Sequence, residues 1–218
     1  MPHEPASSPL LEDGPRDAEL AIVLAHGAGA PMQSAFMQSV ATALASAGNR
    51  VVRFNFPYMQ LLSETGKKTS PDPAAKLMAS WREVVAEIRP RFSDIVIGGK
   101  SLGGRMATMV ADEVRPLAVV CFGYPFHPPG RPDKVRTEHL REMRTPTLIV
   151  QGTRDPFGTP EDVKDYQLSP AIRTAWIEDG DHSLKPRKFS GRTERDNLRE
   201  AVDVTVRFLD QLRASRRP

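Results

Sequence analysis

Short apolar runs alternate with helix-like segments along nearly the whole chain, and no other feature limits the possible folds as strongly. Strands are predicted from the apolar runs 19–25, 50–56, 94–98, 117–122, 147–151 and 175–177. Helices are predicted from periodicity and stop signals over 32–47, 74–88, 102–114, 161–168 and 195–212. Strands that alternate with helices form a mostly parallel sheet with helices on both faces. The chain is therefore predicted to be an α/β protein, a three-layer sandwich around a central sheet of about six or seven strands.

The 218 residues fit a single domain, because a chain of this length buries enough surface to form one core. We predict this domain over residues 19–218. Residues 1–18 are polar and contain proline, so they are expected to be an N-terminal arm, either disordered or forming a weak edge strand. Residues 57–73 contain proline, glycine and paired lysines and are predicted as a loop. The proline-rich segment 123–146 is too short for a helical cap domain.

Composition excludes several classes of protein. The single cysteine, Cys121, rules out an intrachain disulfide and a cysteine-based zinc site, and its apolar surroundings predict a buried, inert thiol. No metal and no cofactor are predicted. No stretch approaches the ~18 apolar residues of a membrane span, and the first residues lack the apolar core of a signal peptide. We therefore expect a cytoplasmic protein that does not insert into membranes.

The charge distribution does not predict a nucleic-acid-binding protein. The formal net charge is +3, with a pI of about 9.2, but acidic residues are mixed with the basic ones through most of the chain. A nucleic-acid binder concentrates its basic residues on one face or in one tract. The one basic tract, residues 213–217, is expected to be a solvated tail.

The pentapeptide 99–103, Gly-Lys-Ser-Leu-Gly, follows a predicted strand and opens a predicted helix. It matches G-x-S-x-G in the strand–turn–helix context in which a serine becomes an exposed nucleophile. Gly99 and Gly103 let neighbouring backbone pass close to the turn without a Cβ clash. The serine, Ser101, also lies at a helix N-terminus, where free N–H groups stabilise developing negative charge. A purely structural turn is the alternative.

Two other uses of these glycines fit the sequence poorly. A P-loop requires G-x-x-x-x-G-K-[ST], but Asp94 occupies the position of its first glycine. A dinucleotide-binding turn requires G-x-G-x-x-G, but Met32 occupies the position of the third glycine in a motif that begins at Gly27. We therefore retain Ser101 as the candidate nucleophile.

A serine nucleophile needs a histidine to accept its proton and a carboxylate to orient that histidine. In hydrolases that carry such a turn, the chain order is serine, acid, histidine. His182 follows the last predicted strand and Asp155 follows the strand before it, so both are expected at the carboxyl edge of the sheet with Ser101. We predict Asp155 as the acid and His182 as the base.

Other residues compete for these two roles. His127 and His139 also follow the serine, but they lie in a proline-rich stretch and are expected to be structural or to line the substrate site. Asp179 and Asp181 are close in sequence to His182, and we expect them to shape its loop.

Negative charge on a substrate oxygen requires two backbone donors, which together form an oxyanion hole. One is predicted to be the N–H of Leu102, the residue after the nucleophile. The other is expected from the first glycine-rich loop, 26–30, and is assigned to Ala28. His26 and Gly27 are expected to support the shape of this loop.

Five phrases of the sequence resemble one group of the α/β-hydrolase superfamily: HGAGAP, GGKSLGGR, CFGYPFHPPG, TPTLIVQGTRDPFG and EDGDHSLK. The resemblance covers about residues 19–212. The group is lidless and dienelactone-hydrolase-like, and it includes testis-expressed hydrolase-like proteins and the hydrolase-like subunit of the non-specific-lethal chromatin complex. The resemblance implies an α/β-hydrolase fold without a cap domain, and it implies the same triad: Ser101, Asp155 and His182.

These observations predict a serine hydrolase that acts on a small carboxylic ester or a related acyl compound, such as a thioester or lactone. The partner is then a small-molecule acyl substrate, and nothing in the sequence indicates an oligomeric state. A catalytically silent binding or scaffold protein on the same fold is the alternative. Basic residues near the proposed loops favour an acidic substrate or are simply solvated: Lys100, Arg105, Arg154, Lys185, Arg187 and Lys188.

Overall fold

The computed structural model describes residues 9–216 and shows a seven-stranded sheet in the order β1-β3-β2-β4-β5-β6-β7. The strands are β1 (Leu10–Asp13), β2 (Leu20–Ala25), β3 (Arg50–Phe54), β4 (Asp94–Lys100), β5 (Ala118–Phe122), β6 (Thr147–Gly152) and β7 (Ile172–Ile177). The edge strand β1 is antiparallel to β3, and all other neighbours pair in parallel. The predicted mostly parallel sheet is therefore confirmed.

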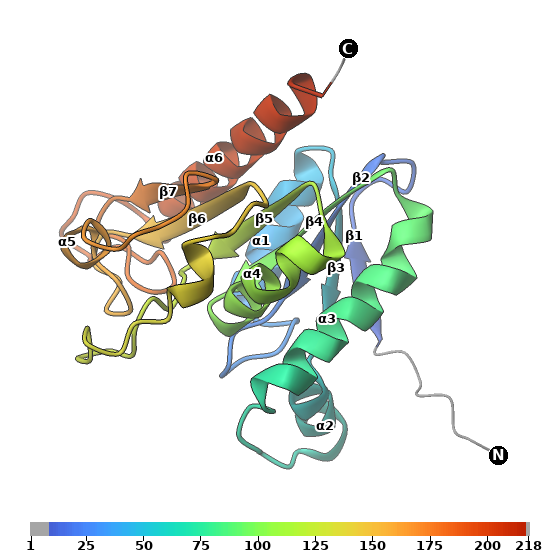
Figure 1. Ribbon diagram of the computed structural model, residues 1–218, viewed down its shortest axis with the longest axis horizontal. Helices are drawn as coiled ribbons and strands as arrows, with labels where there is room; N and C mark the ends of the chain where they lie inside the picture. Colours follow the sequence, from blue (N-terminus) through green and yellow to red (C-terminus); the bar gives the residue numbers. More distant parts are fainter. Residues whose placement is uncertain (1–8, 217–218) are drawn as a thin grey trace.

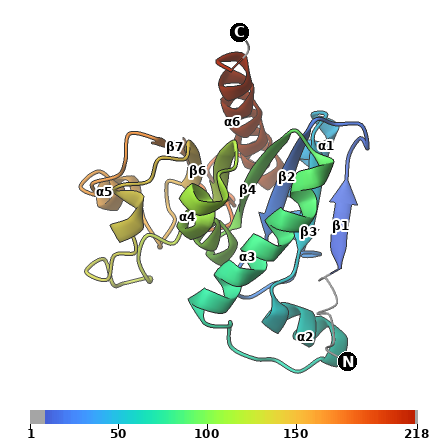
Figure 2. The same ribbon diagram turned by 45° about the vertical axis from the view of Figure 1, so that its right-hand side comes forward.

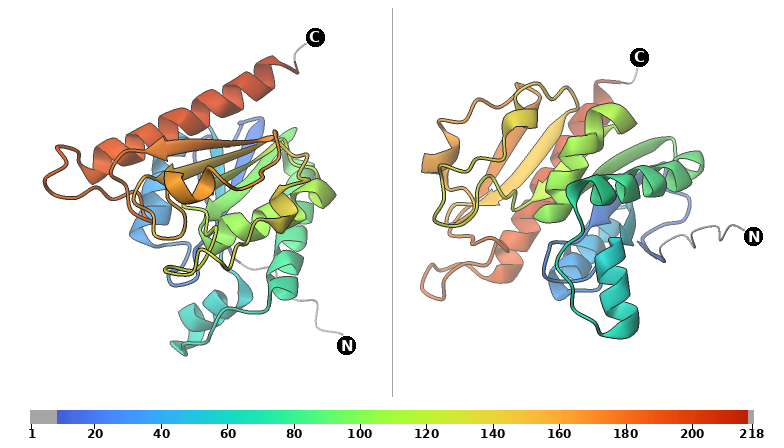
Figure 3. Two further views of the ribbon diagram at one scale, coloured as in Figure 1. Left: turned by 60° about the vertical axis from the view of Figure 1, so that its left-hand side comes forward. Right: turned by 60° about the horizontal axis from the view of Figure 1, so that its bottom comes forward.

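Helices cover both faces of this sheet (Figures 1 and 3). The helices are α1 (Ala35–Ser46), α2 (Pro57–Thr65), α3 (Ala74–Ile88), α4 (Leu102–Val114), α5 (Pro160–Val163) and α6 (Glu194–Ala214), with short 3-10 turns η1 (Arg89–Arg91) and η2 (Glu138–Leu140). The apolar cores show which helix lies on which face: α1 and α6 pack on one, and α3 and α4 pack on the other.

Strand β2 shows how one stretch of sequence supplies both cores. All six of its residues are buried. Ala21, Val23 and Ala25 pack with α3 and α4, whereas Leu20, Ile22 and Leu24 pack with α1 and α6. Successive side chains of a strand point to opposite faces, so an unbroken apolar run is the pattern expected of a strand covered on both sides.

Several predicted boundaries require correction. Residues 57–65, predicted as part of a loop, form α2, because Pro57 occupies the first helical turn and Tyr58 and Met59 are buried against the core. Gly66 ends this helix with a left-handed conformation. The helix predicted over 161–168 is only the short α5, Pro160–Val163.

Strand β1 lies at the edge of the sheet beside β3 (Figure 2). Of the two alternatives for the N-terminal arm, residues 10–13 form an edge strand whose Glu12 and Asp13 pair with Arg50 and Arg53 of β3. Residues 1–8 of the arm and residues 217–218 lie outside the described residues. Within 9–216, no helix is both long enough and apolar enough to cross a bilayer.

The segment between β5 and β6 decides how open the carboxyl edge of the sheet is. Residues 123–146 form turns and the three-residue η2. In the part of the chain that the structure describes, no cap domain is therefore inserted at this position.

Candidate active site

Ser101 stands in the turn between β4 and α4 with φ 48° and ψ −110°, a conformation that non-glycine residues rarely adopt. The turn fits only because glycines flank it. A Cβ atom on Gly99, whose φ is +144°, would lie 2.0 Å from the carbonyl oxygen of Ala25, and one on Gly103 would lie 2.3 Å from the same oxygen. The glycines of the motif therefore allow β2 to approach the turn closely, and the strained serine is held half-exposed at its tip.

The structure brings together the three residues that the sequence singles out. The Oγ of Ser101 lies 2.9 Å from Nε2 of His182. On the other side of the ring, Nδ1 of His182 lies 2.8 Å from Oδ2 and 3.0 Å from Oδ1 of Asp155. The three residues follow β4, β7 and β6, so the carboxyl edge of a parallel sheet gathers groups that are far apart in the sequence.

The carboxylate of Asp155 is fully buried, at 0% exposure, and each oxygen has a protein donor besides the histidine. The backbone N–H of Phe157 donates to Oδ1 at 2.9 Å, and the side-chain amide of Gln151 donates to Oδ2 at 2.9 Å. These donors compensate the buried charge and hold the carboxylate in one orientation.

Gln151 is a site residue that sequence reasoning missed. Its amide nitrogen also donates to the carbonyls of Tyr124 and Gly158, and its amide oxygen accepts from the N–H of Tyr124 at 2.7 Å. A single fully buried amide thus ties Asp155 to the segment after β5. The available signal was a polar residue at the end of an otherwise apolar strand, since such a residue requires hydrogen-bond partners when buried.

Two contacts hold His182, whose side chain is 22% exposed: one with its imidazole and one with its backbone. The ring of Phe157 stacks on it with the centroids 4.2 Å apart. The Lys100 ammonium donates to the backbone carbonyl of His182. A Cβ on Gly123, at φ +68°, would lie 2.6 Å from that carbonyl oxygen and 2.7 Å from the Lys100 nitrogen, so glycine is required there.

Lys100 is buried next to the serine, with its nitrogen 5.2 Å from the centroid of the Phe36 ring. Burial lowers the pKa of its ammonium to about 8, against the opposing effect of the carboxylates of Asp155 and Asp181. Sequence reasoning placed this lysine near the site but missed its contact with the histidine loop.

The loop that carries His182 is held by its own acidic residues, as expected. The carboxylate of Asp179 accepts from the backbone N–H of Arg187 at 2.6 Å and forms ion pairs with Arg154 and Arg187. Asp181 accepts from the backbone N–H groups of Ser183 and Lys185. Asp179 and Asp181 therefore shape the loop, and it is Asp155 that contacts the imidazole.

His26 supports the first glycine-rich loop and is fully buried. Its Nδ1 donates to the carbonyl of Gly27 at 2.6 Å, and its Nε2 accepts from the backbone N–H of Phe56 at 3.0 Å. Burial lowers its pKa to about 4, so the ring is neutral near pH 7. Because a trans peptide points its C=O and N–H in opposite directions, fixing the Gly27 carbonyl also fixes the N–H of Ala28.

The two expected backbone donors are both free of protein acceptors among residues 9–216. Leu102 is the first residue of α4, where N–H groups have no partner within the helix. The carbonyl of Ala28 accepts from the hydroxyl of Tyr58 at 3.0 Å, which anchors this residue from its other side.

The other candidates lie away from this hydrogen-bonded set. Nδ1 of His127 is bonded to the carbonyl of Pro128, and Nε2 of His139 is bonded to the hydroxyl of Thr108. Cys121 is fully buried on β5, where burial raises the pKa of its thiol, as expected of an inert residue.

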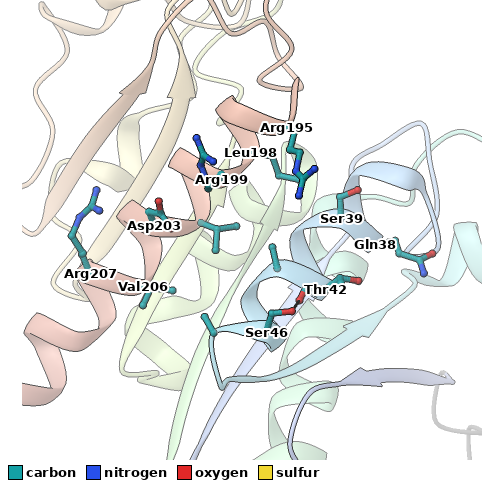
Figure 4. Close-up of a pocket in the computed structure, with 13 residues that line it drawn as sticks. Gln38, Ser39, Thr42, Ser46, Arg195, Leu198, Arg199, Asp203, Val206 and Arg207 are labelled. Atoms are coloured by element: carbon teal, nitrogen blue, oxygen red, sulfur yellow. Dashed lines mark hydrogen bonds between the residues drawn. The ribbon is translucent and has the colours of Figure 1, made fainter. Parts of the chain in front are cut away.

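A groove of about 820 Å³ lies elsewhere, between α1 and α6 (Figure 4). Its sides carry Ser39 and Thr42 from α1 and Arg195 and Arg199 from α6. None of the three hydrogen-bonded site residues lines it. The size of a groove alone therefore does not identify where the hydrogen-bonded Ser101, His182 and Asp155 lie.

Comparison with known proteins identifies the family and the fold. A family described as "Alpha/beta hydrolase domain" matches residues 18–210. An α/β serine hydrolase homologue from Coxiella burnetii is similar in structure, with a TM-score of 0.69, 21% identity and coverage of 91% of this chain and 89% of that chain. A serine hydrolase without a lid from Xanthomonas campestris gives a TM-score of 0.66 at 22% identity, covering 95% of this chain and 97% of that one.

A dienelactone hydrolase from Anabaena variabilis gives a TM-score of 0.67 at 21% identity, covering 91% of this chain and 90% of that chain. At these identities the solved structures show a shared fold. The resemblance to the testis-expressed proteins and to the chromatin-complex subunit stays an expectation from sequence. The family match extends over nearly the whole described chain, so this protein belongs to the α/β-hydrolase domain family.

Proposed function

We propose that the protein is a serine hydrolase that cleaves a small carboxylic ester or a related acyl compound, such as a thioester or lactone, through a Ser101–His182–Asp155 triad. One observation carries the proposal: the continuous hydrogen-bonded chain from the Ser101 hydroxyl through both imidazole nitrogens to a fully buried carboxylate. This is the geometry that activates a serine hydroxyl.

The first half of the reaction transfers the acyl group to the enzyme. The Oγ of Ser101 attacks the carbonyl carbon while Nε2 of His182 takes the hydroxyl proton. The bond from carbon to the leaving oxygen or sulfur then breaks, and the imidazolium returns its proton to that atom. Asp155 accepts the Nδ1–H bond throughout and stabilises the imidazolium charge.

The second half releases the acid. A water molecule attacks the carbonyl carbon of the acyl-serine and gives a proton to Nε2 of His182. The carbon–Oγ bond breaks, and the proton passes to the oxygen of Ser101. The products are a carboxylic acid and the regenerated serine.

Both tetrahedral intermediates carry a negative oxygen, and we propose that the N–H groups of Leu102 and Ala28 bind it. Loss of a single such donor typically lowers the rate about 10²- to 10³-fold. His26 contributes indirectly, because its bond to the Gly27 carbonyl orients the N–H of Ala28. The lidless site suits small or extended esters.

Hydrolysis of p-nitrophenyl acetate and butyrate by wild type and by Ser101→Ala tests the proposal. We expect turnover by wild type and a loss of about 10⁴-fold or more in the variant, with an unchanged melting temperature. Equal rates for the two proteins, or no turnover of esters, thioesters and lactones by folded wild type, support instead a binding or scaffold protein on this fold.

A further inference from the structure

Lys100 is the one buried lysine among residues 9–216. It is 8% exposed, whereas every other lysine in this range is exposed. The lysines that form ion pairs in this part of the chain are Lys76 and Lys185, so the ammonium of Lys100 has no paired carboxylate there. A buried cation without such a partner costs stability. Buried charges of this kind gather at functional sites, and the reaction steps described above do not use Lys100.

The stem of the Lys100 side chain packs beside the nucleophile turn. Lys100 ends β4 and directly precedes Ser101. A Cβ on Gly27 would lie 3.3 Å from Cγ of Lys100 and 3.7 Å from Cβ of Ser101, so the first glycine-rich loop lies against both residues. The ring of Phe36 on α1 has its centroid 5.2 Å from the Lys100 nitrogen. The stem is therefore held between the glycine-rich loop and α1.

The ammonium of Lys100 reaches the loop that carries the proposed base. It donates to the backbone carbonyl of His182. A Cβ on Gly123 would lie 2.6 Å from that carbonyl oxygen and 3.2 Å from Nδ1 of the same histidine. The ammonium, the carbonyl and the ring thus surround one backbone position, which leaves His182 little room to move. The bond therefore joins the residue before the nucleophile directly to the base.

We propose that Lys100 is a positioning residue for the base: its ammonium holds the backbone carbonyl of His182 so that Nε2 of the ring faces Oγ of Ser101. A single side chain then sets the distance between nucleophile and base. Such precision matters for the rate, because a misplacement of about 1 Å in a reacting pair can cost about 10²-fold. The inference rests on the proposed hydrolase and adds a residue to its site.

The strength of this bond depends on the charge of the lysine. Burial lowers the pKa of Lys100 to about 8, although the carboxylates of Asp155 and Asp181 act to raise it. The ring of His182 is the other titratable group that faces the ammonium. His26 in the glycine-rich loop is neutral near pH 7, and α1 contains no charged residue. As the pH rises through about 8, the ammonium becomes a neutral amine, whose hydrogen bond is about half as strong.

Lys100→Met tests the positioning role, because methionine is of similar length and has no donor. We expect kcat for p-nitrophenyl butyrate to fall about 10- to 100-fold, while KM changes less than about 3-fold and thermal unfolding shows a folded protein. Lys188→Met, which changes an exposed lysine beyond the same loop, is the matched control. Unchanged kcat, a raised KM with unchanged kcat, or a loss of activity only in proportion to a loss of folded protein overturns the proposal.

The pH dependence of kcat tests whether the charge of Lys100 matters. Neutral imidazole is the form that accepts a proton, so the triad alone predicts no loss of rate at alkaline pH. With the bond from Lys100, we expect wild-type kcat to fall about 3- to 10-fold between pH 7 and 9.5. Lys100→Met and Lys100→Arg, whose guanidinium stays protonated, should show no such decline. An equal decline in either variant assigns it to another group and contradicts the role of the ammonium.

Hydrogen exchange separates the failure of this inference from the failure of the proposed function. The amides of Asp181 and Leu184 are bonded within the base loop, so their exchange, followed by mass spectrometry, reports how often the loop opens. We expect exchange in peptides that span 178–186 to be about 10-fold faster in Lys100→Met than in wild type and Lys188→Met. Faster exchange without ester turnover by wild type contradicts the hydrolase and supports the Lys100 bond. Ester turnover with equal kcat and equal exchange in all three proteins supports the hydrolase and overturns the inference.

Discussion

Two histidines at the same edge of the sheet have opposite environments. His26 follows β2 and is fully buried, with both ring nitrogens bonded to backbone groups. His182 follows β7 and is 22% exposed, with one nitrogen on a buried carboxylate and the other on a serine hydroxyl. The residue type and the position after a strand are the same, and only the partners differ.

This difference shows that hydrogen-bond partners, more than residue type, separate a base from a structural histidine. The neighbours of His26 fix one neutral tautomer and leave it no proton to exchange with a ligand. The neighbours of His182 leave Nε2 facing a hydroxyl and place a negative charge behind Nδ1, which stabilises the ring when it accepts a proton.

Removing the exposed histidine should have the largest effect on activity. His182→Ala removes the proton acceptor, and we expect kcat for p-nitrophenyl esters to fall about 10⁴-fold or more, while thermal unfolding shows a stable, folded protein. His127→Gln serves as a control at a histidine outside the hydrogen-bonded set. A His182→Ala protein with more than a tenth of wild-type kcat contradicts its role as the base.

Removing the Gln151 amide that holds the Asp155 carboxylate should lower activity less than removing His182. Gln151→Leu removes the amide that donates to Oδ2 of Asp155. Since a hydrogen bond to a charged group is worth about 1.5–3 kcal/mol, kcat should fall roughly 10- to 100-fold with little change in KM. The exposed Gln38→Leu on α1 is the matched control. Unchanged kcat in a folded Gln151→Leu protein would show that Asp155 does not need this bond.

The buried His26 should make the free energy of unfolding depend on pH. The pKa of His26 is about 4 in the folded protein and 6.5 as its reference value. As the pH falls, the unfolded state therefore binds a proton before the folded state does. The contribution of His26 to the free energy of unfolding is complete above pH 6.5, and about 3 kcal/mol of it is lost as the pH falls to about 4.

Urea unfolding of wild type and His26→Gln between pH 7.5 and 4.5 measures this loss. His139 titrates in the same range in both proteins. The difference in how steeply their free energies of unfolding change with pH is therefore due to His26. We expect the variant to be less stable at pH 7.5, and we expect its free energy of unfolding to depend less on pH. Parallel pH profiles for the two proteins would contradict a buried, neutral His26.

The sequence predicted the sheet and the meeting of Ser101, Asp155 and His182, because apolar strands and chain order determine which loops share the carboxyl edge. It did not predict α2, since proline and paired lysines in 57–73 resemble a loop and the burial of Tyr58 depends on tertiary packing. The contacts of Gln151 and Lys100 were also missed. Each joins segments distant in sequence, and no local pattern encodes such a contact.

The central claim is that Ser101 is a nucleophile activated by His182. Its most direct test is intact-mass and peptide mass spectrometry after treatment with a fluorophosphonate, which reacts with activated serines. We predict one adduct on wild type, located on Ser101, and labelling slowed by orders of magnitude in His182→Ala. An adduct on another residue, or equal labelling rates in wild type and His182→Ala, would contradict the account.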